Sequence, residues 1–201
     1  MAIADRLGAE GGAQQLIVVE TRSASDTFGQ LQAFDRVGDR WVPAFPPATA
    51  RLGRGGVSPN HGEGDGTTPA GTFTLTEAFG IQPNPGTLLP YRQVHVNDEW
   101  VSDSLSPFYN TWQVGPANGR WSSSEKMWTF TTAYAYGVVI DYNRFPVVPY
   151  RGDAIFLHVM GSEPTSGCVA IPQDDLVAIM RWLSPLKAPR IAIGTDDLLL
   201  T

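Results

Sequence analysis

The sequence predicts a mainly β domain, a sandwich or a barrel, with one helix near its carboxyl end. Its 201 residues include 21 glycines and 16 prolines, a composition that favours many turns and short strands over a helical bundle. Short apolar runs recur along the chain, whereas a helical pattern is convincing only after residue 171. We expect residues 1–14 to form an N-terminal extension and residues 15–201 to form one domain, which is long enough to bury a full core.

The strands are predicted from β-branched and other apolar runs that are bounded by turn residues. Gly38 and Asp39 form a hairpin turn between the second and third of them, and Pro46 ends the third. The expected strands are residues 15–21, 31–35, 40–45, 68–75, 137–142, 154–159, 169–171 and 190–194.

One helix is predicted to begin at Pro172 and to end near Leu183. Asp174 and Asp175 lie in its first turn, where carboxylates interact favourably with the helix dipole, and Pro185 stops it. Its buried stripe is expected to consist of Leu176, Ile179, Met180 and Leu183.

Local sequence patterns predict a short helix in one further segment and a loop in another. Ser122-x-x-Glu125 has the form of a capping box, which predicts a short helix that begins near Ser123. Residues 53–71 are rich in glycine and carry charges of both signs, so they are predicted to form a mobile surface loop. This loop contains His61, and we expect it to border a site.

Cys168 is the only cysteine in the chain, so no intramolecular disulfide can form. Gly167 permits a sharp turn directly before it, so the amides of Gly167 and Cys168 can converge on one point, as stabilisation of an oxyanion requires. A thiol becomes a useful nucleophile when a neighbouring base raises its thiolate fraction. The alternative is that Cys168 is a small buried apolar residue, which is the commoner role of a lone cysteine.

His158 lies ten residues before Cys168, near the end of the predicted strand 154–159. The intervening loop contains glycine and proline and is long enough to fold back, so we expect the two side chains to lie side by side on adjacent strands. His158 then accepts the thiol proton, or the pair exists as thiolate and imidazolium. Its second ring nitrogen needs an acceptor, for which Asp141, Asn143 and a backbone carbonyl are all candidates.

Composition excludes some classes of function. The chain has 20 acidic and 14 basic side chains and a formal charge of −6, so nucleic acid is not an expected partner. Its apolar runs are far shorter than a bilayer, so no integral membrane segment is expected. A zinc site formed by His61, His95, His158 and Cys168 is not expected either, because their intervals match no familiar ligand pair. We therefore predict no metal and no cofactor.

Two separated motifs resemble those of the L,D-transpeptidase catalytic-domain family (YkuD-type), enzymes that crosslink bacterial peptidoglycan. The first is Thr68-Pro69-Ala70-Gly71-Thr72-Phe73. The second is His158 followed by Thr165-Ser166-Gly167-Cys168-Val169, which is similar to the family's signature of a histidine, a loop and Ser/Thr-x-Gly-Cys. In addition, Trp100-Val101-x-Asp103 and Asp141-Tyr142-Asn143 look like a branch common in actinobacterial sequences.

The resemblance implies an L,D-transpeptidase-like β-sandwich or barrel that forms the single catalytic domain. It makes Cys168 the nucleophile, His158 its base, and the amides of Gly167 and Cys168 the donors to the oxyanion. The residues expected along the substrate are Tyr142, Thr165, Ser166 and His61.

The implied reaction is acyl transfer on peptidoglycan stem peptides. Cys168 attacks the carbonyl of the third residue of a donor tetrapeptide, expels the terminal D-Ala and holds the remainder as a thioester. The amine of a neighbouring stem then resolves the thioester, or water does so, which gives L,D-carboxypeptidase activity. The resemblance also implies acylation by carbapenem-type inhibitors. It implies a secreted protein of the periplasm or cell wall, with a role in cell shape, whose signal peptide is absent from the chain as given.

The chain departs from the family pattern at two positions. Ser166 stands where many members have a second histidine, and Ala170 stands where they often have arginine or asparagine. The loop between His158 and Cys168 is also shorter than usual. Two other functions stay open: another cysteine amidase or peptidase that uses the same pair, and a catalytically silent wall-binding module in which Cys168 is buried.

Overall fold

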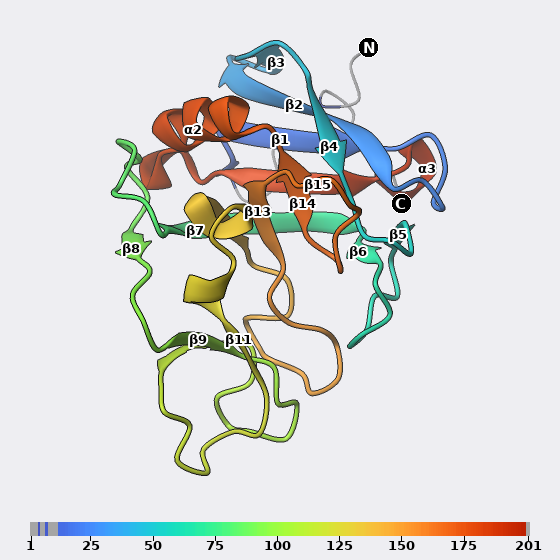
Figure 1. The fold of residues 1–201 in the computed structure, drawn as a ribbon. Helices are drawn as coiled ribbons and strands as arrows, with labels where there is room; N and C mark the ends of the chain where they lie inside the picture. Colours follow the sequence, from blue (N-terminus) through green and yellow to red (C-terminus); the bar gives the residue numbers. More distant parts are fainter. Residues whose placement is uncertain (1–3, 5–6, 8–11, 200–201) are drawn as a thin grey trace.

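The computed structural model describes Ala4, Leu7 and residues 12–199, so most of the predicted extension, residues 1–14, lies outside the described residues. Among the described residues, eight strands form a closed ring (Figure 1). In ring order they are β1 (Gln15–Glu20), β15 (Arg190–Gly194), β7 (Gly71–Gly80), β12 (Gly137–Ile140), β13 (Phe156–Val159), β14 (Val169–Ile171), β4 (Ala48–Arg51) and β2 (Phe28–Val37). The predicted mainly β fold is confirmed, and of the two predicted forms the sheet is a barrel.

The ring closes because β1 pairs on both of its edges. Ile17 of β1 lies opposite Ile191 of the parallel strand β15 and opposite Ala33 of the antiparallel strand β2. Outside the ring, β3 (Arg40–Pro43) pairs with β2, and β8 (Tyr91–Gln93) pairs with β7. Alternate side chains of the ring point inward, so Ile17 and Ile191 share one buried core.

The helix α2 (Gln173–Trp182) packs against this inner core. Its core residues are those predicted from the helical spacing, namely Leu176, Ile179, Met180 and Leu183. Gln15 of β1 holds the end of the helix, because its side chain donates to the Trp182 carbonyl at 2.6 Å and accepts from the Ser184 amide at 2.9 Å. Both ends of the Gln15 amide are thus satisfied inside the fold.

A second, smaller sheet docks on the outer face of the barrel. It contains β9 (Asp98–Val101), β10 (Trp112–Val114) and β11 (Ser124–Lys126), which lie below the barrel in Figure 1. The ring of Trp100 meets the ring of Phe156 edge to face, with 4.9 Å between centroids. Such aromatic pairs contribute about 0.5–1.5 kcal/mol beyond their burial. Trp100, Phe156 and Cys168 belong to one apolar cluster, so this docking covers the barrel face that carries the cysteine.

The short helix predicted near Ser123 is wrong. Ser124–Lys126 forms the strand β11, and the Ser122 hydroxyl donates to the Asp103 carboxylate at 2.8 Å. The Glu125 carboxylate accepts a hydrogen bond from the Tyr134 hydroxyl. Both members of the apparent capping pattern therefore have partners that are distant in the chain, and these partners override the local signal.

The glycine-rich segment 53–71 is more structured than a surface loop. It contains the short parallel strands β5 (Val57–Ser58) and β6 (Thr68–Pro69), and its His61 is buried. The Gly53 amide donates to the Thr68 hydroxyl at 2.8 Å, which ties the start of the segment to its end. The single strand expected over residues 68–75 is accordingly divided between β6 and β7.

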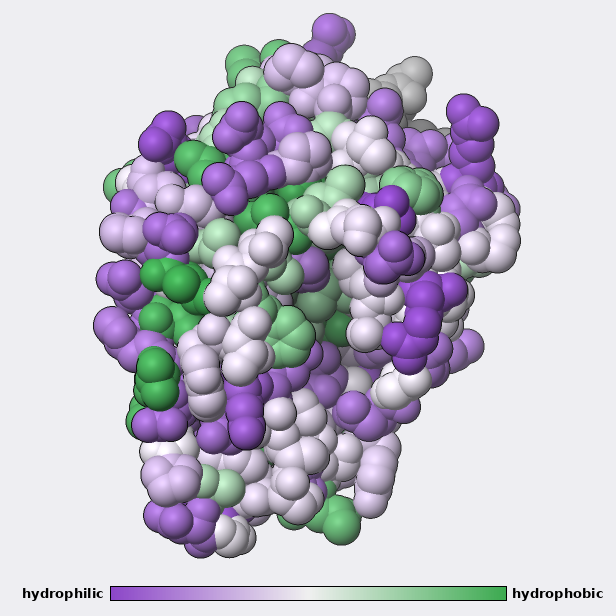
Figure 2. Space-filling model, viewed as in Figure 1, coloured by the Kyte–Doolittle hydropathy of each residue, from purple (hydrophilic) through white to green (hydrophobic). Residues whose placement is uncertain are grey.

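The surface of the molecule is mixed in polarity. In Figure 2 polar residues cover most of the visible face, and apolar residues occur in small separate groups. None of the helices formed by the described residues is both long and apolar enough to cross a membrane.

Candidate active site

Cys168 lies at the barrel's outer face, directly before β14. Its thiol donates to the Ala154 carbonyl at 3.2 Å and accepts from the Phe156 amide at 3.4 Å. Only 9% of the residue is exposed. In the resting structure the sulfur is therefore held by the backbone that leads into β13.

His158 lies on the same face of the sheet as Cys168. β13 and β14 are parallel, with Leu157 opposite Val169 and His158 opposite Ala170. Leu157 and Val169 point into the inner core, so the alternating residues His158 and Cys168 point outward together. Within the described residues, however, no hydrogen bond joins the imidazole to the thiol, whose proton points to the Ala154 carbonyl instead.

The orientation of the His158 ring is fixed by a backbone carbonyl. Nδ1 lies 2.9 Å from the Val159 oxygen, and a carbonyl can only accept, so Nδ1 carries the proton and Nε2 carries the lone pair. The two side chains that were candidates for this acceptor have other partners. The Asp141 carboxylate accepts from Thr74, and the Asn143 amide donates to the Gly152 carbonyl. The Tyr134 ring packs edge to face on the imidazole at 5.7 Å.

Burial keeps both groups of the pair neutral. It raises the pKa of the Cys168 thiol, with the Glu125 carboxylate adding to the shift, and it lowers the pKa of His158. Of the two forms that the sequence left open, the free protein therefore has the neutral thiol and neutral imidazole rather than the ion pair.

A cavity of about 190 Å³ opens onto the sulfur. The sequence-predicted residues that line it are Cys168, Gly167, Ser166 and His61. His158, Tyr142 and Thr165 are not among its lining residues. The cavity thus approaches the sulfur from the side of the His61 segment.

The turn before Cys168 is formed by Thr165 and Gly167. The Thr165 hydroxyl donates to the Cys168 carbonyl at 2.6 Å and accepts from the Gly167 amide at 3.2 Å. Gly167 has a φ of +149°, and a Cβ there would lie 3.0 Å from the Thr67 carbonyl oxygen. Glycine is needed at this point of the turn, and its amide is already occupied.

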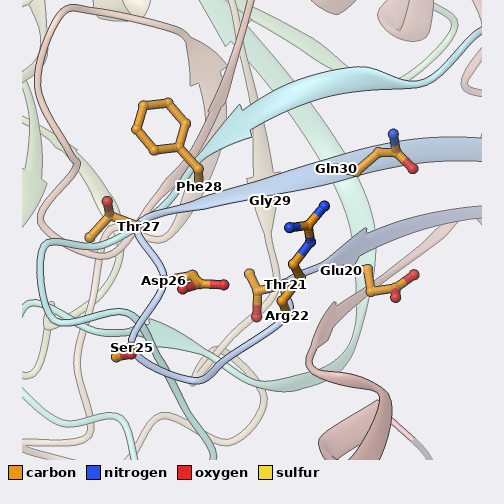
Figure 3. Close-up of a pocket in the computed structure, with 9 residues that line it drawn as sticks. All are labelled: Glu20, Thr21, Arg22, Ser25, Asp26, Thr27, Phe28, Gly29 and Gln30. Atoms are coloured by element: carbon orange, nitrogen blue, oxygen red, sulfur yellow. The ribbon is translucent and has the colours of Figure 1, made fainter.

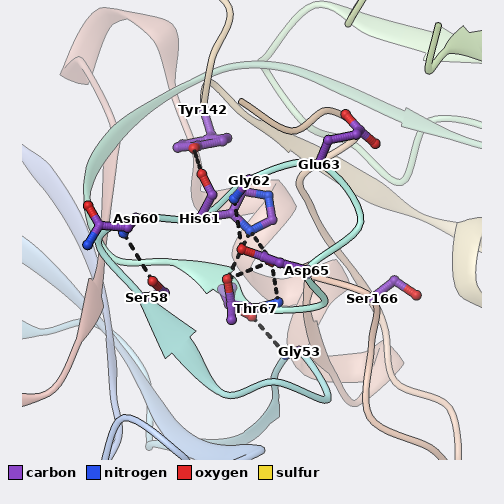
Figure 4. Close-up of polar contacts among 12 residues, drawn as sticks. Gly53, Ser58, Asn60, His61, Gly62, Glu63, Asp65, Thr67, Tyr142 and Ser166 are labelled. Carbon is purple, nitrogen blue, oxygen red and sulfur yellow. Dashed lines mark hydrogen bonds and ion pairs between the residues drawn. The ribbon is translucent and has the colours of Figure 1, made fainter. Parts of the chain in front are cut away.

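Tyr142 contacts His61 and does not line the cavity. Its hydroxyl donates to the His61 carbonyl at 2.8 Å, and its ring meets the imidazole edge to face at 5.1 Å (Figure 4). Ser166 lies across the figure, and its hydroxyl accepts from Arg54 at 3.0 Å.

Three carboxyl groups line the same cavity: Glu63, Glu125 and Asp153. Burial, together with the neighbouring carboxylates of Glu63 and Glu125, raises the pKa of Asp153 to about 8. Burial also raises the pKa of Glu125. Neither Glu125 nor Asp153 was predicted at the site, because Glu125 was assigned to a helix cap and Asp153 lies in an irregular segment without periodicity.

Substituting Glu125 by glutamine is expected to make Cys168 more reactive. The change removes a negative charge that raises the thiol pKa, so the thiolate fraction below that pKa should rise roughly tenfold for each unit by which it falls. The pH dependence of iodoacetamide alkylation measures this. Glu163→Gln, an exposed carboxylate outside the cavity lining, is the matched control. Equal alkylation rates in Glu125→Gln and the wild type would contradict the electrostatic assignment.

A larger pocket of about 620 Å³ lies at the connection between β1 and β2 (Figure 3). Its lining includes Glu20, Arg22 and Asp26 but neither a cysteine nor a histidine. No three His, Cys, Asp or Glu side chains within the described part of the chain are grouped to hold a metal ion. Cys168 therefore lies on the smaller cavity and not on the larger pocket.

Comparison with known proteins places these features in a family. The family model described as the L,D-transpeptidase catalytic domain (YkuD) matches residues 38–193. No curated protein matches the chain. Among solved structures, the helical cell shape determining protein Pgp2 from Campylobacter jejuni is similar over 98% of this chain, with 12% identity and a TM-score of 0.47, and the chain spans 58% of that protein. The matched segment covers most of the barrel and the whole of the Cys168 cavity, and the chain belongs to the L,D-transpeptidase catalytic-domain family.

Proposed function

We propose that this protein transfers acyl groups between peptidoglycan stem peptides through a thioester on Cys168. One observation carries the proposal: the only cysteine of a chain in this family lies on a cavity and shares one sheet face with an imidazole whose Nε2 is unprotonated. A nucleophile, an adjacent base and a space for the reacting carbonyl are the parts that acyl transfer requires.

In the first step the Cys168 thiol turns from the Ala154 carbonyl toward His158. Nε2 takes the thiol proton as sulfur attacks the carbonyl carbon of the third stem residue. The carbon–nitrogen bond to the terminal D-Ala breaks, and the imidazolium returns its proton to the leaving amine. The Gly167 amide already donates a hydrogen bond to the Thr165 hydroxyl. We therefore assign the Cys168 amide as the hydrogen-bond donor to the oxyanion.

In the second step the thioester reacts with an amine of another stem, or with water. The first outcome is L,D-transpeptidation and the second is L,D-carboxypeptidase activity. Ser166 and His61 line the space that the peptide enters, whereas Thr165 and Tyr142 support its walls. We propose further that carbapenem-type inhibitors acylate Cys168 and that the protein acts outside the cytoplasmic membrane, where its substrate lies.

A catalytically silent wall-binding module is the second candidate. The buried sulfur, its bond to the Ala154 carbonyl and its raised pKa favour it. Under this alternative the cavity holds a stem peptide, but no covalent bond forms.

Mass spectrometry of the intact protein separates these candidates. We expect incubation with a stem tetrapeptide to add the mass of the tripeptide acyl group, and meropenem to add its own mass. An amine acceptor should then release a crosslinked product. Binding of the tetrapeptide without any covalent mass would favour the silent module, and cleavage of unrelated amides at equal rates would favour a general cysteine amidase.

A further inference from the structure

His61 is a second imidazole in the Cys168 cavity. It lies in the segment between β5 and β6 (Figure 4) and is only 6% exposed. Together with Cys168 it lines the cavity. Its Cε1 atom would lie 3.5 Å from a Cβ built on Gly167, the residue before the nucleophile. Nε2 lies over Gly152, which lines the same cavity and where a Cβ would approach to 2.4 Å. Glycine at 152 leaves the room that the ring occupies.

Asp65 and Thr67 fix the tautomer of this imidazole. Nδ1 of His61 lies 3.1 Å from Asp65 Oδ1 and 3.1 Å from the Thr67 hydroxyl. Thr67 donates its hydroxyl proton to Asp65 Oδ1 at 2.8 Å, so its oxygen is left as an acceptor. Both partners of Nδ1 are therefore acceptors, which places the proton on Nδ1 and the lone pair on Nε2.

Asp65 is held as a carboxylate by its own donors. Besides the Thr67 hydroxyl, it accepts the Thr67 amide at 2.8 Å and the Gly62 amide at 2.8 Å. Against the effect of burial, these hydrogen bonds and His61 lower the pKa of Asp65. No described residue forms a hydrogen bond with Nε2 of His61, so this atom is left for a ligand in the cavity.

The charged groups around His61 leave it neutral. Burial lowers the pKa of the imidazole, and the carboxylates of Asp65 and Glu63 on its own segment oppose that shift. The other titratable groups that face it are Tyr142 with Arg151 from the segment after β12, and Asp153, Glu125 and Cys168 across the cavity. His158 is absent from this lining, so the two imidazoles approach the sulfur from different surroundings.

We propose that His61, positioned by Asp65, is the general base of the second half-reaction, in which an amine resolves the thioester. Nε2 takes a proton from the attacking amine as the new carbon–nitrogen bond forms. The carbon–sulfur bond breaks, and the imidazolium gives that proton to the departing sulfur, which restores thiol and imidazole. The inference rests on the proposed function, and it assigns the two half-reactions to different bases: His158 to acylation and His61 to transfer.

The test separates the two half-reactions by quenched-flow mass spectrometry. In His61→Gln, acylation of Cys168 by the tetrapeptide should slow by less than about tenfold, which is the effect of a changed wall of the peptide space and not of a lost base. Transfer to a stem peptide that carries a free amine should slow by about 10²–10³-fold, so the thioester accumulates. His95→Gln, which removes an exposed imidazole outside the cavity, is the matched control and should change neither rate.

Asp65→Asn provides a readout that a purely structural role would not give. Its carboxylate raises the pKa of His61, so its loss should move the acidic limb of the transfer rate to lower pH while acylation keeps its profile. The inference alone is overturned if His61→Gln slows both steps equally or leaves transfer at the wild-type rate. It is also overturned if the acidic limb of the transfer profile does not shift in Asp65→Asn. A wild-type protein that forms no thioester overturns the proposed function and the inference together.

Discussion

Replacement of Cys168 by alanine is expected to abolish both carbapenem acylation and tetrapeptide turnover. The sulfur is the atom that forms the proposed thioester, and no second cysteine exists to replace it. Removal of a nucleophile of this kind costs on the order of 10⁴-fold in rate or more. Intact-mass spectrometry with meropenem and product analysis with the tetrapeptide measure the two losses.

The fold should survive this substitution. The sulfur has two hydrogen bonds, to the Ala154 carbonyl and the Phe156 amide, and their loss costs about 1–2 kcal/mol of unfolding free energy. Cys168→Ser, which keeps both partners, is the control with a poorer nucleophile. Unchanged covalent labelling in the alanine variant would refute the assignment, since the label would then lie elsewhere.

Removal of the His158 imidazole is expected to slow acylation by about 10²–10⁴-fold, the usual contribution of a general base. His158→Gln keeps a polar side chain on β13 and is less disruptive than alanine in this buried position. The second-order rate of acylation by meropenem measures the effect. His95→Gln serves as the imidazole control here too, and an unchanged rate in His158→Gln would show that another group accepts the thiol proton.

The protonation of His158 should make the acylation rate of the wild type depend on pH. Burial lowers the pKa of His158, so its basic form persists below the ordinary imidazole range. The rate should therefore fall only as the pH drops through this lowered pKa, below about 6.5. The variant should lack that limb.

The local elements of the fold were predictable because their signals are local. The run of apolar residues in β12 and the first-turn carboxylates Asp174 and Asp175 of α2 define their elements without reference to the rest of the chain. Closure of the barrel depends instead on β1 pairing with β15 across most of the sequence, and no local pattern of Ile17 or Ile191 specifies that pairing. A sandwich and a barrel were therefore equally compatible with the strands.

The candidate site was predictable in part for the same reason. A histidine and a cysteine at the ends of one short loop were expected on one sheet face, and the register of His158 opposite Ala170 confirms this placement. Glu125 could not be predicted, because it reaches the cavity through the docking of the small sheet, and Asp153 could not, because it lies in the irregular segment before β13. Burial first, and these two carboxylates in addition, raise the pKa of the Cys168 thiol, and sequence spacing carries no signal of either.

The cavity lies at the interface between the barrel and the small sheet, which share no strand pairing among the residues that the structure describes. Glu125 comes from β11 of the small sheet, whereas Cys168 belongs to the barrel, and the contact of Trp100 with Phe156 holds the two together. Mild heat or dilute urea that separates the two sheets would therefore disrupt the proposed catalytic site while the ring of strands persists. Loss of the proposed activity should then precede the loss of far-ultraviolet dichroism, because the contact between the two sheets opens before the barrel unfolds.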